Sequence, residues 1–214
     1  MPSQAPLTVH LVRHGETEWN RDGRCQGVTD IPLTPKGLSQ AEAVAATFAA
    51  KRPGLILSSP LQRARETARR IAEPHGLGCE TVAALREWDQ GELEGLTGAQ
   101  LLGEHTAFFH RWQQDPAHTP PPGGETLETL QSRAWPVVDR LREQACDGSV
   151  VVVSHTMTIA TILCAALGLD LGNIHRLKID LASRSTIVFG QFGLFSLWRL
   201  ASLNDRHHLT DRLR

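Results

Sequence analysis

An arginine, a histidine and a glycine follow one another at Arg13, His14 and Gly15, directly after the apolar run 7–12. That run is rich in β-branched residues and predicts a short strand, so the three residues fall in the turn that ends it. Arginine supplies a permanently charged planar fork, histidine a nucleophile, and glycine a backbone that a ligand can approach closely. The trio suits a phosphate group, although an isolated Arg-His pair would be explained equally well by a surface charge beside a hydrogen-bonded turn histidine.

A second arginine is predicted to lie at the start of a helix. The apolar run 55–57 is typical of a strand buried on both faces of a parallel sheet, and Ser59 and Pro60 follow it as helix cap and first helical residue. Arg63 then falls in the first helical turn, where backbone amides and the helix dipole favour an anion. The same helix carries further arginines that we interpret as a solvated basic face: Arg65, Arg69 and Arg70.

Two more segments offer groups for acid–base chemistry. The stretch 85–95 holds four carboxylates that would ordinarily form a solvated acidic loop, and spacing alone does not choose among them: Glu87, Asp89, Glu92 and Glu94. Four consecutive valines at 150–153 predict a buried strand, and His155 follows the end of that strand as His14 follows the first. A packed histidine would also fit there, but matching positions at two strand ends favour one shared site.

The rest of the chain alternates predicted helices and strands. Residues 34–50 carry apolar side chains at three- and four-residue intervals after a Thr34 cap, which predicts a helix. Further helices are expected at 96–114, from 124 onward with a kink or break at Pro136, and at 156–167 up to Gly168. A weak strand at 78–82 and a terminal hairpin at 187–195 complete the pattern. We expect an α/β fold over 1–214 as a single domain: a three-layer α/β/α sandwich with a mostly parallel central sheet and a C-terminal antiparallel hairpin.

One segment combines aromatic side chains with a constrained loop. The predicted helix 96–114 carries Phe108, Phe109 and Trp112, and the loop 115–124 that follows it contains four prolines and two glycines. The plainer interpretation puts these aromatic residues in the core. With the loop, they are also candidates for a lid over the organic part of a substrate.

Composition excludes several classes of protein. A net charge of −1 gives no general attraction to nucleic acid or to anionic membranes, and no apolar run is long enough to span a bilayer. With no signal-peptide pattern at 1–6, we expect a soluble, cytoplasmic protein.

Four scattered cysteines predict free thiols, mostly in the core: Cys25, Cys79, Cys146 and Cys164. The ten histidines lack metal-ligand spacing, and His207 and His208 lie in a charged tail, so no metal is expected.

The longer strings around these residues resemble a known family. Arg-His-Gly-Glu-Thr-Glu-Trp-Asn at 13–20, followed by the segments 23–27 and 30–34, is similar to the opening of the histidine phosphatase superfamily, in the branch that contains the cofactor-dependent phosphoglycerate mutases. The segments 58–68 and 152–156 resemble its second and fourth motifs. The resemblance extends over most of the chain, from about Val9 to Leu169.

The resemblance implies a role for each candidate residue. His14 would attack phosphorus and become phosphohistidine, while Arg13, Arg63 and His155 would hold the transferring group. The family's third motif aligns its proton-transferring carboxylate with Glu87. Residues near the phosphate or substrate would add Asn20, Gln26 and Gly27. No cofactor and no metal are implied, and we expect the second ring nitrogen of His14 to donate to a backbone carbonyl.

The third motif favours a phosphatase over a mutase. Mutases carry a Glu-Arg-His-Tyr-Gly-like string where this chain has Glu-Trp-Asp-Gln-Gly at 87–91, and they usually carry an insertion for which this chain is short. We therefore expect a metal-independent phosphomonoesterase acting on small-molecule phosphate esters. The alternatives are a cofactor-dependent phosphoglycerate mutase and a non-catalytic phospholigand-binding relative. The sequence does not choose the ester, and it leaves the oligomeric state open, with a homodimer as one option.

Overall fold

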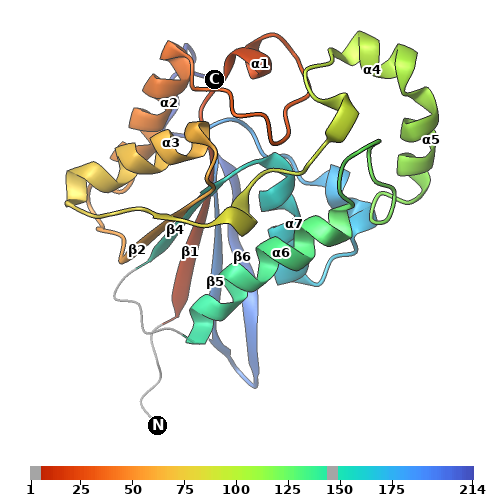
Figure 1. Cartoon of the computed structure of the whole chain (residues 1–214). Helices are drawn as coiled ribbons and strands as arrows, with labels where there is room; N and C mark the ends of the chain where they lie inside the picture. Colours follow the sequence, from red (N-terminus) through yellow and green to blue (C-terminus); the bar gives the residue numbers. More distant parts are fainter. Residues whose placement is uncertain (1–5, 144–148) are drawn as a thin grey trace.

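A computed structural model of the protein describes residues 6–143 and 149–214. The strands are β1 (Leu7–Arg13), β2 (Leu55–Ser58), β3 (Glu80–Thr81), β4 (Val150–Ser154), β5 (Arg184–Phe192) and β6 (Phe195–Asp205). The α-helices are α1 (Glu18–Arg21), α2 (Pro35–Ala46), α3 (Gln62–Ala72), α4 (Gly98–Glu104), α5 (Thr106–Gln114), α6 (Leu127–Asp139) and α7 (Thr156–Leu167) (Figure 1). Short 3-10 helices lie at η1 (Glu73–His75), η2 (Ala83–Leu85), η3 (Gly91–Leu93), η4 (Arg140–Glu143) and η5 (Leu171–Arg176).

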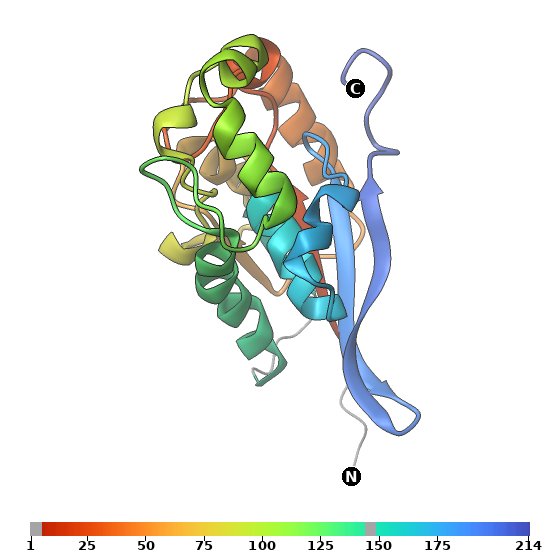
Figure 2. The same ribbon diagram turned by 90° about the vertical axis from the view of Figure 1, so that its right-hand side faces the viewer.

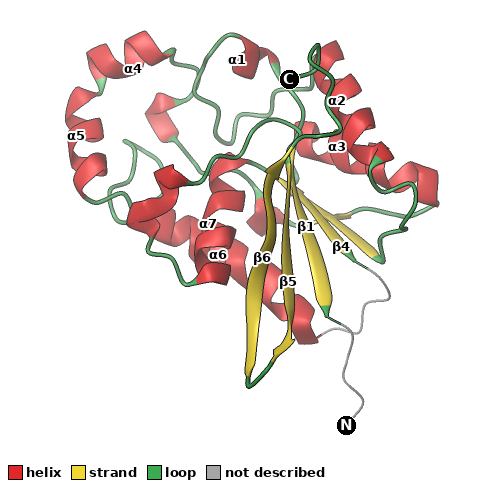
Figure 3. Ribbon diagram, turned by 180° about the vertical axis from the view of Figure 1, so that it is seen from behind, coloured by secondary structure: helices red, strands yellow, loops and turns green. Residues whose placement is uncertain are grey.

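A six-stranded sheet has the order β3-β2-β4-β1-β5-β6. Strands β3, β2, β4 and β1 pair in parallel, whereas β5 is antiparallel to both β1 and β6. The predicted mostly parallel sheet with a C-terminal hairpin is therefore confirmed. The hairpin is longer than the predicted 187–195, and its tip projects beyond the helices (Figures 2 and 3).

Both faces of the sheet are covered by helices, because its central strands alternate their apolar side chains between two clusters. Val151 and Val153 of β4 pack with side chains of α2 and α3, whereas Val150 and Val152 pack with side chains of α6 and α7. All five residues of β4 are buried. The predicted three-layer arrangement is confirmed, and the run of valines is explained by burial on both sides.

The first helices begin and end differently from the prediction. Helix α2 has the predicted Thr34 cap, whose side chain accepts from Gly37 N, but it ends at Ala46 and not near residue 50. Thr47 turns its hydroxyl back to Val44 O at 2.7 Å and closes the helix. Helix α3 begins at Gln62, so the predicted start at Ser59 and Pro60 is wrong. The Asp30 carboxylate, from a distant segment, accepts from Gln62 N at 2.7 Å and does the capping.

Three later elements also depart from the prediction. The expected helix 96–114 is two helices that meet at His105, and the second places Phe108, 3% exposed, on the core. Helix α6 continues through Pro136 to Asp139, so the expected break does not occur; the proline lies in its last turn. The weak strand 78–82 is reduced to Glu80–Thr81. Helix α7 ends as predicted before Gly168, whose φ of 64° is the left-handed conformation that glycine favours.

Two expectations from composition concern the cysteines and the membrane. Cys25, Cys79 and Cys164 are free thiols, but only Cys164 is buried, so the expectation that they lie mostly in the core is wrong for the half-buried Cys25 and Cys79; Cys146 lies outside the described residues. Within 6–143 and 149–214, none of the helices has the length and apolar character required to cross a membrane.

The turn after β1 is pressed against the first turn of α2. A Cβ on Gly15 would lie 2.3 Å from Gly37 O, and a Cβ on Gly37 would lie 2.1 Å from Glu16 O. Glu16 N also donates to the Gln40 side chain on α2 at 2.8 Å. Glycine is required at both positions because two backbones meet there. The helix thereby fixes the turn that carries His14.

Gly37→Ala should therefore destabilise the protein although alanine favours helix. Overpacking against rigid backbone is expected to lower the free energy of unfolding by roughly 1–3 kcal/mol. Gly103→Ala is the matched control, because Gly103 is also helical and its Cβ would meet nothing within 4 Å. Urea denaturation should show this control unchanged or slightly stabilised; equal stability of the two variants would contradict the close approach.

Candidate active site

The carboxyl ends of β1, β4 and β2 meet at one edge of the sheet and bring the predicted residues together. Arg13 ends β1 and is paired in register with Ser154 of β4, so His14 and His155 follow neighbouring strands. Their ring centroids are 5.0 Å apart. Arg63 approaches from the first turn of α3, which follows β2. This is the edge where doubly wound sheets place their ligands.

His14 is held in a single tautomer. Its Nδ1 lies 2.7 Å from Gly15 O, and because a carbonyl oxygen only accepts, Nδ1 carries the proton and Nε2 a lone pair. The ring is 3% exposed. Burial, followed by the charges of Arg63 and Arg13, lowers the pKa of His14 well below its usual value. The expected backbone acceptor is therefore present, and the ring is neutral at physiological pH.

His155 is also buried, and its partner was not predicted. Its Nε2 lies 2.7 Å from Ser59 Oγ, and its Nδ1 is buried without a hydrogen-bond partner. Burial first, then the charges of Arg63 and His14, lowers the pKa of His155 well below its usual value. Ser59 thus contacts His155, and its hydroxyl also accepts from Leu61 N at 3.3 Å just before α3. Ser59 follows the end of β2 as His14 and His155 follow the ends of β1 and β4. This position could have predicted a place in the site, but we interpreted Ser59 as a helix cap.

Arg13 and Arg63 are anchored by backbone carbonyls. Arg13 Nη1 donates to Ile179 O at 2.7 Å, and Arg63 donates to Thr29 O at 2.8 Å and to Gly27 O at 2.6 Å. Burial lowers the pKa of each guanidinium to about 10, so both remain charged at neutral pH. Neither forms a salt bridge within 6–143 and 149–214, and the Nε of each is buried without a partner. The two cations are thus placed to bind an anion.

Glu87 is distinguished from its acidic neighbours by its surroundings. It is 4% exposed, and its carboxylate accepts from Trp88 N at 2.8 Å and from Met157 N and Thr158 N at 3.2 Å each. The last two donors open α7, where the helix dipole also favours an anion. The other carboxylates lie elsewhere: Glu94 accepts from Val28 N and Thr29 N, Asp89 accepts from Gly91 N, and Glu92 is exposed.

Arg133 of α6 supports the Glu87 segment and was missed by sequence reasoning. It donates to Ala84 O at 2.6 Å, to Arg86 O at 2.9 Å and to Glu87 O at 2.9 Å. It also pairs with the Glu125 carboxylate at 2.5 Å. One guanidinium therefore fixes the backbone on which the candidate acid stands. The signal in the sequence is faint, because Arg133 is a single arginine in a helix of mixed polarity.

A cavity of about 340 Å³ is lined by three of the five predicted groups, whereas Arg63 and His155 are fully buried and are not among its lining residues. Arg13, His14 and Glu87 line its charged end, and its walls are mostly apolar: Trp88, Leu93, Leu101, Phe108, Phe109, Trp112 and Met157. The three helical aromatic residues thus line the cavity while Phe108 is also part of the core. None of the described residues in loop 115–124 lines it, so the structure gives that loop no direct place in a lid.

The three subsidiary candidates differ in position. Asn20 and Gln26 line the cavity, and both accept the Thr17 hydroxyl with their side-chain oxygens, at 3.0 and 2.8 Å. This leaves Gln26 Nε2 buried without a partner. Gly27 does not line the cavity; a Cβ there would lie 2.7 Å from Trp88 O, and its own carbonyl holds Arg63. Gly27 therefore acts through Arg63.

The two lowered histidine pKa values lead to a titration prediction. Because burial and neighbouring positive charge disfavour the imidazolium, His14 and His155 should stay neutral on acidification through pH 6.5. Exposed His118, paired with Asp115, has a raised pKa and should gain its proton above pH 6.5. Nitrogen-15 spectra of the imidazoles, assigned with His14→Ala and His155→Ala, would measure this. Protonation of His14 near pH 6.5 would contradict the burial argument.

Comparisons with known proteins agree on one family. Residues 9–206 match the model of the histidine phosphatase superfamily, branch 1. Phosphoserine phosphatase 1 of Hydrogenobacter thermophilus is 35% identical over 83% of this chain and 84% of its own length. A probable phosphoglycerate mutase of Yersinia pestis is 34% identical over 95% of each chain. The solved structure of a mycobacterial glucosyl-3-phosphoglycerate phosphatase is 32% identical, covers 94% of this chain and 100% of its own, and superposes with a TM-score of 0.84. The chain belongs to the histidine phosphatase superfamily.

Proposed function

We propose that the protein hydrolyses small-molecule phosphate monoesters through a phosphohistidine intermediate on His14. The observation that carries this proposal is the tautomer of His14: its Nδ1 proton is committed to Gly15 O, so Nε2 is the basic atom left for phosphorus. Arg13 and Glu87 line the same cavity as His14, the neutral His155 ring lies 5.0 Å from the His14 ring, and Arg63 is close enough for its charge to lower the pKa of His14. Nucleophile, charge stabilisers and acid are thus provided by one site.

In the first step, Nε2 of His14 attacks phosphorus as the bond to the ester oxygen breaks. Negative charge on the equatorial oxygens is stabilised by the two guanidinium groups, whose orientation is fixed before substrate binds. Glu87, in its protonated form, gives its proton to the departing alkoxide and becomes a carboxylate. The products are phosphohistidine and the alcohol.

In the second step, water attacks the phosphohistidine. The Glu87 carboxylate accepts a proton from the water, inorganic phosphate forms, and His14 is released as the neutral imidazole. Two arginines and two histidines supply the charge stabilisation that a metal ion gives in other phosphatases, so we propose a metal-independent reaction.

A cofactor-dependent phosphoglycerate mutase is the second candidate, supported by the similarity to the Yersinia protein. The string Glu-Trp-Asp-Gln-Gly at 87–91 supports the phosphatase.

The cavity supports esters with a partly apolar organic group that also carries hydrogen-bond acceptors. Its walls are largely aromatic and aliphatic, yet Gln26 Nε2 and Trp112 Nε1 are buried donors without partners. The relatives' substrates by name, phosphoserine and glucosyl-3-phosphoglycerate, both carry carboxylates that could accept from such donors.

We propose that the chain forms one domain and acts in the cytoplasm, which the free thiols of Cys25, Cys79 and Cys164 support; a homodimer stays a prediction.

Labelling with a phosphate ester carrying radioactive phosphorus tests the intermediate. Brief reaction of the wild type, in the presence of EDTA, should give a protein label that survives alkali and is lost in acid, the behaviour of phosphohistidine. His14→Ala should remove both label and turnover. Undiminished labelling of His14→Ala, or activity that EDTA abolishes and Mg²⁺ or Zn²⁺ restores, would refute the mechanism. Transfer of the label to phosphoglycerate in place of water would identify the mutase.

The acid can be identified by its dependence on the leaving group. An alkoxide needs a proton as it departs, whereas nitrophenolate largely does not, so Glu87→Gln should slow an alkyl phosphate roughly a hundredfold or more and nitrophenyl phosphate much less. If hydrolysis of phosphohistidine limits the rate, both substrates will slow and the label will accumulate. Glu92→Gln is the matched control, since Glu92 is exposed and outside the cavity. The leaving-group pattern in this control, with Glu87→Gln behaving as wild type, would reject Glu87.

A further inference from the structure

The turn 178–183 lies beside the two residues that lead into the site. Arg13 Nη1 donates to Ile179 O at 2.7 Å, and Arg13 N donates to Ser183 O at 3.0 Å. In the other direction, Ala182 N donates to His14 O at 3.0 Å. The turn therefore contacts the guanidinium of Arg13 and the backbone on both sides of the nucleophile. A shift of this turn would therefore move the Arg13 guanidinium and the backbone of Arg13 and His14.

The end of β6 holds the turn 178–183 in place. Asp180 N donates to Asn204 Oδ1 at 2.7 Å, and Asn204 Nδ2 donates back to Asp180 Oδ2 at 2.9 Å. Arg206 pairs with the same carboxylate at 3.1 Å. His208 Nε2 lies 2.9 Å from Ala182 O, a carbonyl that only accepts, so the imidazole is the donor. One segment, 204–208, thus grips the turn at two places.

Backbone strain is concentrated at this junction. Among the described residues, the non-glycine residues with positive φ are Ala182, at 51°, and Asn204, at 53°. Such conformations are uncommon for residues with a Cβ and persist only where surrounding contacts impose them. One lies in the turn and the other in the segment that grips it. Asparagine tolerates this region better than most residues and supplies the required amide at the same position.

We propose that Asn204 and His208 are positioning residues for catalysis, which hold the turn 178–183 so that Arg13 and His14 keep the geometry needed in the transition state. The proposal rests on the proposed phosphatase function, because it assigns these residues an effect through Arg13 and His14. Neither Asn204 nor His208 lines the cavity over His14. Their influence is therefore expected on turnover more than on substrate binding.

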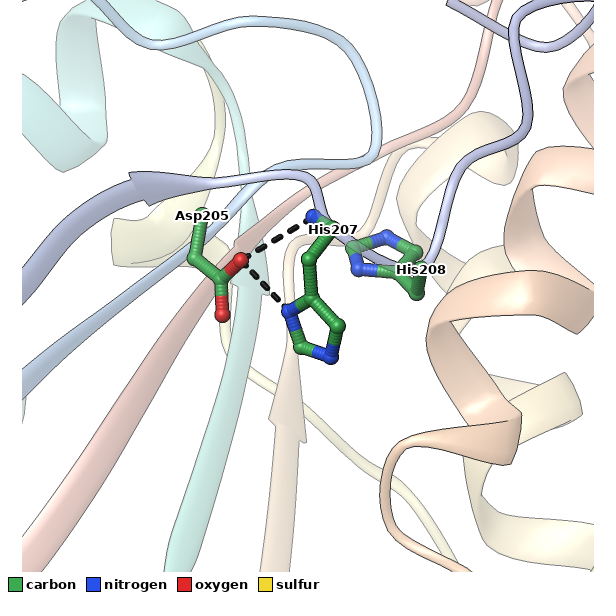
Figure 4. Close-up of side chains that lie close together, drawn as sticks. All are labelled: Asp205, His207 and His208. Atoms are coloured by element: carbon green, nitrogen blue, oxygen red, sulfur yellow. Dashed lines mark hydrogen bonds and ion pairs between the residues drawn. The ribbon is translucent and has the colours of Figure 1, made fainter.

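A metal site explains the same cluster less well. Asp205, His207 and His208 each offer a ligand atom, and these atoms lie within 4.8 Å of one another (Figure 4). However, Asp205 is already paired with Arg184 at 3.1 Å and accepts from His207 Nδ1 at 2.7 Å. A guanidinium directly on the carboxylate opposes a second cation there. In addition, His208 already donates to Ala182 O, and Ala182 N in turn donates to His14 O in the active site.

Asn204→Gly tests the amide without disturbing the backbone, because glycine adopts the positive φ freely. We expect kcat to fall about ten- to a hundredfold, as a displaced catalytic group implies, with KM changed less than threefold. Gln191→Ala is the matched control: Gln191 is an amide on the same hairpin that donates to Gly193 O at 2.8 Å, away from the turn. Its kinetics should equal those of the wild type.

A second pair of variants guards against a purely structural effect. His208→Gln keeps a donor that can reach Ala182 O and should retain most activity, whereas His208→Ala should lose kcat as Asn204→Gly does. In an Arg13→Lys background, Asn204→Gly should cost less than in the wild type, because the part of its effect that passes through the Arg13 guanidinium and Ile179 O is already lost. Thermal unfolding of each variant must lie well above the assay temperature.

The outcomes separate this inference from the function on which it rests. A wild type that releases no phosphate from any ester would reject the proposed function. An active wild type in which Asn204→Gly and His208→Ala lose stability but keep wild-type kcat would reject the positioning role alone. Fully additive losses with Arg13→Lys would also reject it. Selective, non-additive loss of kcat would support it.

Discussion

The structure depends on one electrostatic constraint, which is that the buried His14, Arg63 and His155 and the half-buried Arg13 lie in one corner without a salt-bridge partner among the described residues. Burial alone would make such a cluster unfavourable, and the protein reduces the cost in two ways. The imidazoles of His14 and His155 are neutral, and the guanidinium groups of Arg13 and Arg63 point donors at backbone carbonyls, which offer partial negative charge without a counterion. The remaining positive charge is left for a phosphate dianion.

The sequence predicted through burial which segments of the candidate site lie at one edge of the sheet. The valine run and the apolar strands before Arg13 and Ser59 mark central strands, and the carboxyl ends of parallel strands meet at one edge whatever the details of the loops. His14, Arg63 and His155 could therefore be brought together from patterns of hydrophobicity. Glu87 could not be chosen from hydrophobicity, because the donors that surround its carboxylate come from the first turn of α7, seventy residues further along the chain.

The features that sequence reasoning missed are contacts between distant segments. Asp30 caps α3 from another loop, so a local rule placed the helix start at Ser59, whose hydroxyl in fact faces His155. Arg133 supports the Glu87 segment through three carbonyls, a role that a single helical arginine does not reveal. Local signals describe what a segment prefers by itself. They do not describe which partner satisfies its polar groups in the fold.

The residues proposed for catalysis and those proposed for substrate recognition lie in parts of the chain that differ in how much surface they bury. Apart from Glu87, the groups proposed to act on phosphate stand at strand ends and helix starts, whereas α4 and α5 supply four of the seven apolar side chains of the cavity wall. These two helices lie at one edge of the molecule (Figure 1). Helix α4 buries none of its residues, and α5 buries only Phe108. Elements with so little buried surface open at low energetic cost and tolerate substitution on their cavity side. The groups at the strand ends can therefore keep their geometry while side chains of the wall change, so the proposed phosphate transfer and the choice of ester are physically separable in this fold.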